Sequence, residues 1–216
     1  MSKSETIDHI MECAIKAFAQ WGYEGASLRQ IAAHAGVTLS SIDAYFGSKK
    51  DLYVAAELKV WEKINEERNA LLKRAIAEHP HQPITLREFF TALAMPILLR
   101  VLSDSESMAA QVHFIQSRIN EHQAVSGTLL TTVDRHVSQL IDTMASACPE
   151  LDRNDLVWAF SYGVAVIYSW QLMYHRYDRL LAHDRDRSLE SILEDVVSFC
   201  CGGVQALVER RARQAP

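Results

Sequence analysis

Residues 38–44 carry side-chain groups that can read the edges of base pairs. Serine and threonine hydroxyls donate or accept hydrogen bonds, a carboxylate at Asp43 can accept from a cytosine amine, and Leu39 and Ala44 can meet thymine methyls. The candidate reading residues are Thr38, Leu39, Ser40, Ser41, Asp43 and Ala44. Such groups read a groove only from the outward face of a short helix, so the neighbouring elements have to position one there.

The surrounding segment, 27–52, predicts two short helices and the start of a third. Glycines can adopt the positive φ that turns the chain sharply after a helix, and serine or threonine can cap the next one. The boundary signals are Ser27 with Gln30 as a capping box, Gly36, Thr38, Gly47, and Ser48 with Asp51. Two short helices joined by a glycine turn form a helix-turn-helix, whose second helix fits the major groove.

Cations flank this predicted helix pair. Lys49 and Lys50 fall in the first turn of a helix, where the helix dipole disfavours positive charge, so a phosphate between them would explain their position. Arg29 on the supporting helix is a weaker phosphate-binding candidate. A solvated lysine pair is the alternative. Asp43 is expected either to read a base or to pair with Arg29 or Lys49.

At these residues the chain resembles the TetR family of bacterial repressors. The matching residues are Ser27-Leu28, Ile31-Ala32, Ala35-Gly36-Val37-Thr38, Tyr45-Phe46 and Ser48-Lys49-Lys50 before Leu52, with Ile7, Ala14, Phe18, Gly22 and Tyr23 upstream. The resemblance covers about the first quarter of the chain. It implies that Tyr45 contacts phosphate. Ser27 is a further candidate DNA-binding residue. Two positions depart from the family: Asp43 replaces a usual aromatic residue, and Ala44 stands where histidine is common.

Composition describes an ordinary soluble globular protein of 216 residues, 49% hydrophobic and 23% charged. No apolar run approaches the roughly 18 residues of a membrane span, and the N-terminus lacks a signal-peptide core, so a cytoplasmic location is expected. The net charge is −5, and residues 1–52 carry five Lys or Arg against six Asp or Glu. Without a basic footprint, DNA binding has to rely on a few well-placed contacts.

Helical periodicity without strand-like alternation predicts an all-α fold. We expect a helix-turn-helix DNA-binding domain over 1–52, joined by a long helix to a helical effector-binding and dimerisation domain over 53–216. In that long helix, Glu62 to Arg68 are expected to be exposed. Two prolines in residues 78–83 mark a boundary, and Thr85 with Glu88 forms a capping box that opens the next helix.

An effector cavity is expected in the C-terminal domain, where the resemblance places one. Its candidate lining residues are Phe90, Met108, Phe114, Arg118, Val133, Trp158, Tyr162 and Trp170. Arg118 would either pair with an acidic residue on its own helix or bind the carboxylate of an apolar effector, because an unpaired buried cation is costly.

The last two long helices carry small and apolar residues on one face each. The resemblance implies that these helices form a four-helix bundle with a second subunit; the alternative is burial within one subunit. The candidate interface residues are Ala159, Gly163, Ile167, Val197, Val204 and Val208. The expected assembly is a homodimer on a double-stranded operator.

Catalytic, cofactor and metal motifs are absent from the sequence, so we expect no enzyme activity, no cofactor and no metal. Cys200 and Cys201 leave a thiol-sensing regulator open as an alternative. A helical binding module with weak DNA affinity is another, since the N-terminal residues are acidic on balance.

Overall fold

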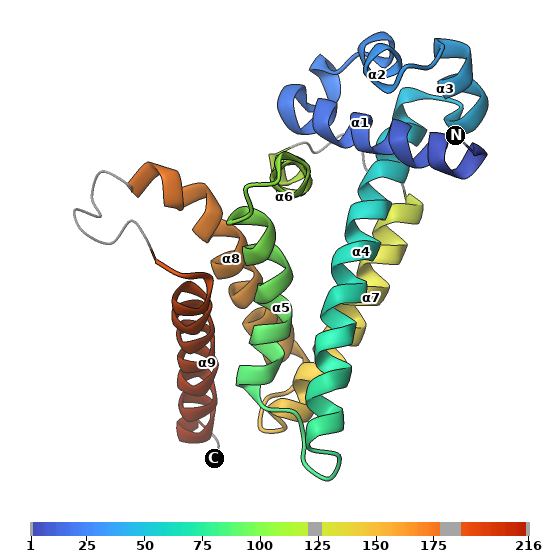
Figure 1. The fold of residues 1–216 in the computed structure, drawn as a ribbon. Helices are drawn as coiled ribbons and strands as arrows, with labels where there is room; N and C mark the ends of the chain where they lie inside the picture. The colour runs from blue at the N-terminus through green and yellow to red at the C-terminus, as the bar shows by residue number, and fades with distance from the viewer. Residues whose placement is uncertain (1, 121–126, 178–186, 215–216) are drawn as a thin grey trace. The chain divides into compact units, whose positions relative to one another are not determined.

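The computed structural model describes residues 2–120, 127–177 and 187–214, and all regular secondary structure there is helical (Figure 1). The helices are α1 (Lys3–Gly25), α2 (Leu28–Ala35), α3 (Leu39–Phe46), α4 (Lys49–Glu78), α5 (Leu86–Val101), α6 (Glu106–Asn120), α7 (Gly127–Ala147), α8 (Arg153–Tyr177) and α9 (Leu189–Gln214). The all-α prediction is confirmed.

The helices group into two compact units. The first contains residues 1–63 and 103–133, and the second contains residues 64–102 and 134–216. Helix α4 is continuous and contributes residues to both units. Helix α6 therefore packs with the N-terminal helices, although the sequence prediction assigned it to the C-terminal domain.

Aromatic packing holds the first unit together. The ring of Phe18 on α1 lies 4.9 Å from that of Tyr53 on α4 and 5.8 Å from that of Phe114 on α6, measured between centroids. All three side chains are buried. Helix α1 packs against both α2 and α6, so this core fixes the support on which α2 and α3 rest.

Several helix boundaries follow local signals in the sequence. The predicted Thr85–Glu88 capping box is present at the start of α5. Gly22, with φ of 66°, interrupts the regular geometry of α1 near its C-terminal end. A second capping box, Ser2–Glu5, is present at the start of α1.

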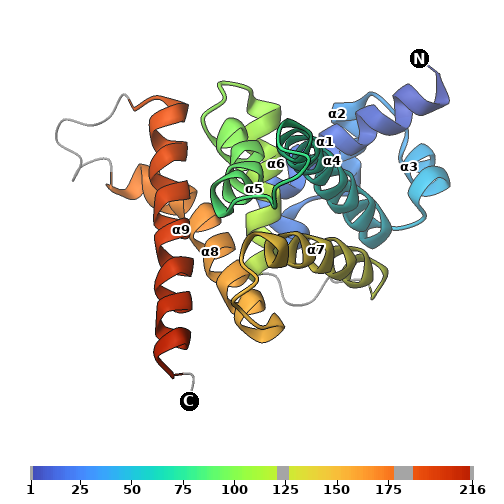
Figure 2. The same cartoon turned by 90° about the horizontal axis from the view of Figure 1, so that it is seen from below.

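In the second unit, α5 packs against α8 and α9, and Figure 2 shows α8 and α9 side by side. A Cβ added to Gly163 on α8 would lie 2.5 Å from Cε1 of the buried Phe90 ring on α5. The glycine therefore permits a close approach of helices within the protomer.

The expected exposure of Glu62 to Arg68 is wrong for part of that segment. Asn65 and Arg68 are buried, at 4% and 2% exposure, whereas Glu62 and Glu66 are exposed. The physical reason is that Arg68 lies inside the second unit, where it donates hydrogen bonds to Leu93 O on α5 and the Tyr168 hydroxyl on α8.

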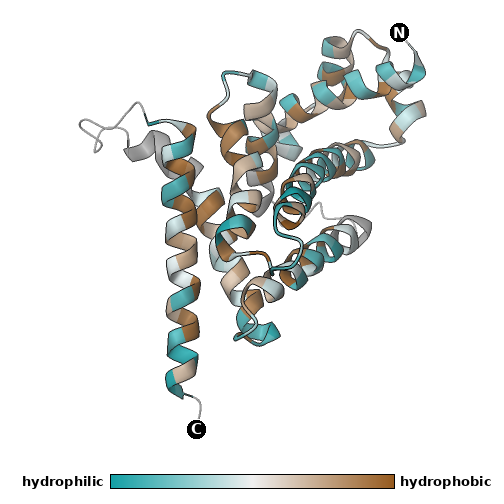
Figure 3. Ribbon diagram, turned by 60° about the horizontal axis from the view of Figure 1, so that its bottom comes forward, coloured by the Kyte–Doolittle hydropathy of each residue, from teal (hydrophilic) through white to brown (hydrophobic). Residues whose placement is uncertain are grey.

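Helix α9 is, within the described ranges, the one helix long and apolar enough to cross a membrane. Core helices of proteins outside membranes meet the same criterion. Figure 3 shows apolar residues recurring along α9 between polar ones. Glu194 and Asp195 on one side and Glu209 on the other bound its uncharged stretch, residues 196–208.

Candidate nucleic-acid interface

The turn between α2 and α3 has helix-turn-helix geometry. Gly36 adopts the left-handed conformation, with φ of 65° and ψ of 27°, and its N–H donates to the carbonyls of Ala32 and Ala33. The Val37 N–H donates to Ala32 O at 3.0 Å, which satisfies the end of α2. Thr38 then caps α3, where its hydroxyl accepts from the Ser41 N–H at 3.2 Å.

The predicted capping box at the start of α2 is wrong. Ser27 occupies the N-cap position with extended backbone, but its side chain makes no capping hydrogen bond. Its carbonyl accepts from the Ile31 N–H, so the helix begins there on backbone bonding alone. The half-buried Ser27 hydroxyl is thus not committed to a cap.

The outward face of α3 presents the residues expected to read bases. Ile42 is buried beneath this face and anchors the helix, while Ser41 is half-buried. The exposed residues are Thr38, Leu39, Ser40, Asp43, Ala44 and Tyr45. The Thr38 hydroxyl lies 2.8 Å from both the Ser40 and Ser41 hydroxyls, so the polar groups at the start of α3 are ordered as one cluster.

Asp43 pairs with neither Arg29 nor Lys49 in the described part of the chain, where no ion pair includes it. Its carbonyl accepts from the Gly47 N–H at 2.9 Å, and its carboxylate stays exposed on the reading face. The geometry leaves this carboxylate able to accept from a base amine.

The two lysines after α3 have different surroundings. Lys49 Nζ donates to Glu24 O at 3.3 Å and lies 4.8 Å from the centroid of the Tyr23 ring, so this side chain braces α4 against the end of α1. Lys50 is exposed.

The sequence reasoning missed Lys3, whose Nζ lies 5.9 Å from the centroid of the Tyr45 ring. The spacing of Ser2 and Glu5 is typical of a capping box, and it could have indicated that α1 already includes Lys3.

The residues expected to line an effector cavity fall in both units. Met108 and Val133 are half-buried in the first unit, where Phe114 lies in the aromatic core. Phe90 is buried in the second unit, whereas Trp158 and Tyr162 are exposed at 60% and 56% and stack with centroids 6.0 Å apart. The side chains of Arg118 and Trp170 lie outside the described residues.

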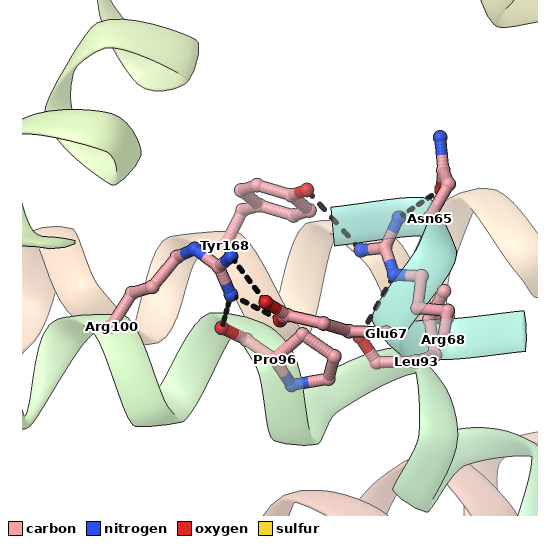
Figure 4. Close-up of polar contacts among 7 residues, drawn as sticks. All are labelled: Asn65, Glu67, Arg68, Leu93, Pro96, Arg100 and Tyr168. Carbon is pink, nitrogen blue, oxygen red and sulfur yellow. Dashed lines mark hydrogen bonds and ion pairs between the residues drawn. The ribbon is translucent and has the colours of Figure 1, made fainter. Parts of the chain in front are cut away.

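A buried polar cluster, formed by Asn65, Glu67, Arg68, Arg100 and Tyr168, lies inside the second unit (Figure 4). The Arg100 guanidinium donates to both Glu67 oxygens at 2.6 and 2.8 Å. Arg68 donates from Nη1 to Asn65 Oδ1 at 3.2 Å and from Nη2 to the Tyr168 hydroxyl at 3.3 Å. The sequence reasoning missed this cluster. The spacing of residues could have indicated that Arg68 is buried, because Arg68 lies four residues from both Ile64 and Leu72 and so shares a helix face with them.

Most candidate interface residues are already buried within one protomer. They are Ala159, Gly163, Ile167, Val197 and Val204; Val208 is half-buried. The large apolar side chains that remain exposed on α8 and α9 are Val157, Trp158, Tyr162 and Phe199.

The cysteine pair on α9 is not activated for thiol chemistry. Burial raises the pKa of the Cys200 thiol to about 11. Burial also raises the pKa of Cys201, against a lowering effect of Arg87. Because the thiolate is the reactive species, both sites are poor nucleophiles near neutral pH.

Two family models match the chain. The model of bacterial regulatory proteins of the tetR family matches residues 10–56, and the model of the tetracyclin repressor-like C-terminal domain matches residues 91–203. An uncharacterized HTH-type regulator, YezE of Bacillus subtilis, is 36% identical over 47 residues, 22% of this chain and 24% of its own length. The HTH-type regulator AcrR of Shigella flexneri is 35% identical over 85 residues, 39% of this chain and 38% of its own. These alignments span well under half of each relative.

Solved structures share the fold over almost the whole chain. A TetR-like regulator from Rhodococcus sp. RHA1 has a TM-score of 0.67 at 14% identity, covering 95% of this chain and 98% of its own. A transcriptional regulator from Pseudomonas aeruginosa PAO1 has a TM-score of 0.66 at 19% identity, covering 99% of this chain and 95% of its own. AibR, solved with isovaleryl coenzyme A and operator DNA, has a TM-score of 0.60 at 19% identity, covering 90% of this chain and 97% of its own. The chain thus belongs to the TetR family and is a DNA-binding transcription regulator rather than an enzyme.

Proposed function

We propose that this regulator is a homodimeric repressor that acts in the cytoplasm, binds a near-palindromic operator and leaves it when a small, largely apolar acid binds. The observation that carries the proposal is the exposed reading face of α3, held in place by the left-handed turn at Gly36. A helix presented in this way can enter the major groove with hydroxyls, a carboxylate and methyl groups toward the bases.

Exposed apolar surface supports the homodimer. Phe199 on α9 is 70% exposed, and the stacked Trp158–Tyr162 pair on α8 is more than half exposed. Covering these side chains with the same helices of a second subunit would remove apolar surface from water and form a four-helix bundle. A symmetric dimer then presents two α3 helices to two half-sites.

Helix α4 supports coupling between effector and DNA. It runs unbroken from Lys49, directly after the reading helix, to Glu78, and it carries Asn65 and Arg68 of the buried polar cluster. A ligand that changed the packing around these residues would shift the population of α4 positions and so the spacing of the reading helices. The fold-sharing regulator AibR was solved with both an acyl-coenzyme A and operator DNA, which is consistent with such coupling.

The thiol-sensing alternative is disfavoured by the raised pKa values of Cys200 and Cys201. A binding module with weak DNA affinity is the remaining alternative. It differs from our proposal in one measurable respect: it would enrich no defined DNA sequence.

The proposal is tested by selection from a pool of random duplex DNA, with the full chain as bait. We expect enrichment of two inverted half-sites whose centres lie about one helical turn apart, roughly 10 base pairs, with salt-dependent affinity. Sedimentation of the protein with the selected duplex should give two protomers for each pair of half-sites. Failure to enrich any sequence, or enrichment of a single half-site bound by one protomer, contradicts the proposal.

A further inference from the structure

Arg68 is a buried cation whose hydrogen-bond acceptors are all neutral. Its guanidinium, 2% exposed, donates from Nε to Leu93 O at 3.3 Å, from Nη1 to Asn65 Oδ1 and from Nη2 to the Tyr168 hydroxyl. No carboxylate among the described residues forms an ion pair with it. A buried charge without a counter-ion is unfavourable, so this site favours an incoming anion.

The nearby Glu67 carboxylate forms its ion pair with Arg100. It accepts from both terminal nitrogens of Arg100, which also donates from Nη1 to Pro96 O at 2.7 Å. This bidentate arrangement pairs the single negative charge of Glu67 with Arg100, and no ion pair among the described residues joins Glu67 to Arg68. The cluster therefore contains one compensated arginine, Arg100, and one uncompensated arginine, Arg68.

Asn65 connects Arg68 to a small cavity. Its Oδ1 accepts from Arg68, while its buried Nδ2 has no hydrogen-bond partner among the residues that the structure describes. Asn65 lines a cavity of about 30 Å³ between α4 and α7, together with Asn69, His136, Gln139, Leu140 and Thr143. An amide whose oxygen is bonded to a cation becomes a stronger donor at its nitrogen, so the free end of Asn65 favours an anionic acceptor.

We propose that this cavity binds the carboxylate of the effector, with Asn65 Nδ2 as the direct donor and Arg68 behind it as the compensating charge. The inference rests on the proposed function, in which an acid binds the helices C-terminal to the DNA-binding segment. About 10–15 Å³ of cavity volume admits one water, so a cavity of about 30 Å³ has room for the two oxygens of one carboxylate, and the apolar part of the acid has to extend outside it. An ordered water would satisfy the Asn65 amide but not the charge of Arg68, so an acid is favoured over water. The compensating charge in this proposal is Arg68 on α4, whereas the sequence analysis offered Arg118 on α6 as one of two alternatives, the other being a pair with an acidic residue on its own helix.

The test compares acids with neutral analogues on the full chain. Thermal shift and titration calorimetry are run at constant ionic strength with sodium butyrate, octanoate and benzoate, with the matching primary amides, and with inorganic phosphate. We expect at least one carboxylate to raise the Tm while its amide does not. Equal shifts with acid and amide, a shift with phosphate alone, or no shift with any of these probes overturns the proposal.

Asn65→Asp is the sharpest variant because it supplies an internal counter-ion to Arg68. We expect it to raise the Tm of the ligand-free protein and to weaken carboxylate binding by at least about tenfold, the difference made by losing a hydrogen bond to a charged group. Asn154→Asp, the same change at an exposed position on α8, should leave carboxylate binding unchanged. Arg68→Met should also abolish the acid response. An unchanged carboxylate affinity in either Asn65→Asp or Arg68→Met contradicts the assignment.

DNA binding is measured in parallel on the same samples. A protein that binds carboxylates through Asn65 but enriches no DNA sequence retains the carboxylate site and loses the proposed function. A protein that binds an operator but ignores every acid retains its role as a DNA-binding regulator and loses this inference.

Discussion

The DNA-binding segment, residues 27–52, and the buried polar cluster are both built from polar side chains, but they are ordered over different distances along the chain. In the DNA-binding segment the ordering side-chain bonds join near neighbours, such as Thr38 with Ser41 and Ser48 with Asp51. In the cluster, Arg68 bonds to residues 25 and 100 positions away. The first region is exposed and positioned by local geometry, whereas the second is buried and positioned by helix packing.

If packing orders the cluster, breaking its compensated ion pair has the largest effect on stability. Arg100→Met leaves Glu67 without its bidentate partner, and we expect the free energy of unfolding to fall by about 2–3 kcal/mol, less than for a fully buried pair because Glu67 is partly exposed. Arg74→Met, which removes an exposed pair with Glu78, should cost under about 0.5 kcal/mol. Urea unfolding of the two variants measures the difference. Equal losses would place the cluster pair among ordinary surface pairs.

Helix packing in the second unit is probed next by Gly163→Ala. The added methyl would lie 2.5 Å from the buried Phe90 ring, so overpacking should cost about 1–3 kcal/mol. Gly202→Ala on α9 meets nothing within 4 Å and should be neutral or slightly stabilising. Thermal unfolding of both variants decides the matter. A Gly163→Ala protein as stable as the wild type would show that α5 and α8 do not require this close approach.

Local geometry in the DNA-binding segment is probed by Gly36→Ala. No side chain obstructs the new methyl, so the expected cost of about 1 kcal/mol comes from the positive φ alone. Because the turn sets the position of α3, operator affinity should fall together with stability. Titration of labelled operator measures this loss, with Gly202→Ala again as the control. Wild-type affinity in Gly36→Ala would mean that the turn does not position the reading helix.

The smallest expected effect distinguishes the two lysines that follow the reading helix. Lys50→Ala should weaken binding to all DNA sequences equally and lower the salt slope by roughly one, because the exposed Lys50 side chain is available to phosphate. Lys49→Ala should change the salt slope less, since Lys49 bonds to Glu24 O. Anisotropy titrations over a salt series compare the two. A larger slope change for Lys49 would reverse these roles.

The same contrast explains what the sequence could predict. Gly36, Thr38 and the serine before α4 signal helix ends through chemistry within a few residues, so the helix pair and its exposed face were predictable. The Ser27 cap failed because a residue type that can cap does not have to point its hydroxyl at the helix.

Long-range packing accounts for what the sequence did not predict. The burial of Arg68 depends on α5 and α8 covering one face of α4, which no short window of sequence contains. The sequence could mark Gly163 as a small residue that lets another helix approach. It could not show that the neighbouring side chain is Phe90 of the same protomer.

The central claim is that the outward face of α3 reads the operator, and base preference tests it most directly. The wild type, Ser40→Ala and Asp43→Ala are each used to select from the same library of single-base operator variants. The account predicts that each variant changes the preferred base at one or two symmetric positions, with each affected base pair worth about 1–3 kcal/mol. Base preferences identical to those of the wild type for both variants would show that residues 38–44 are not the reader.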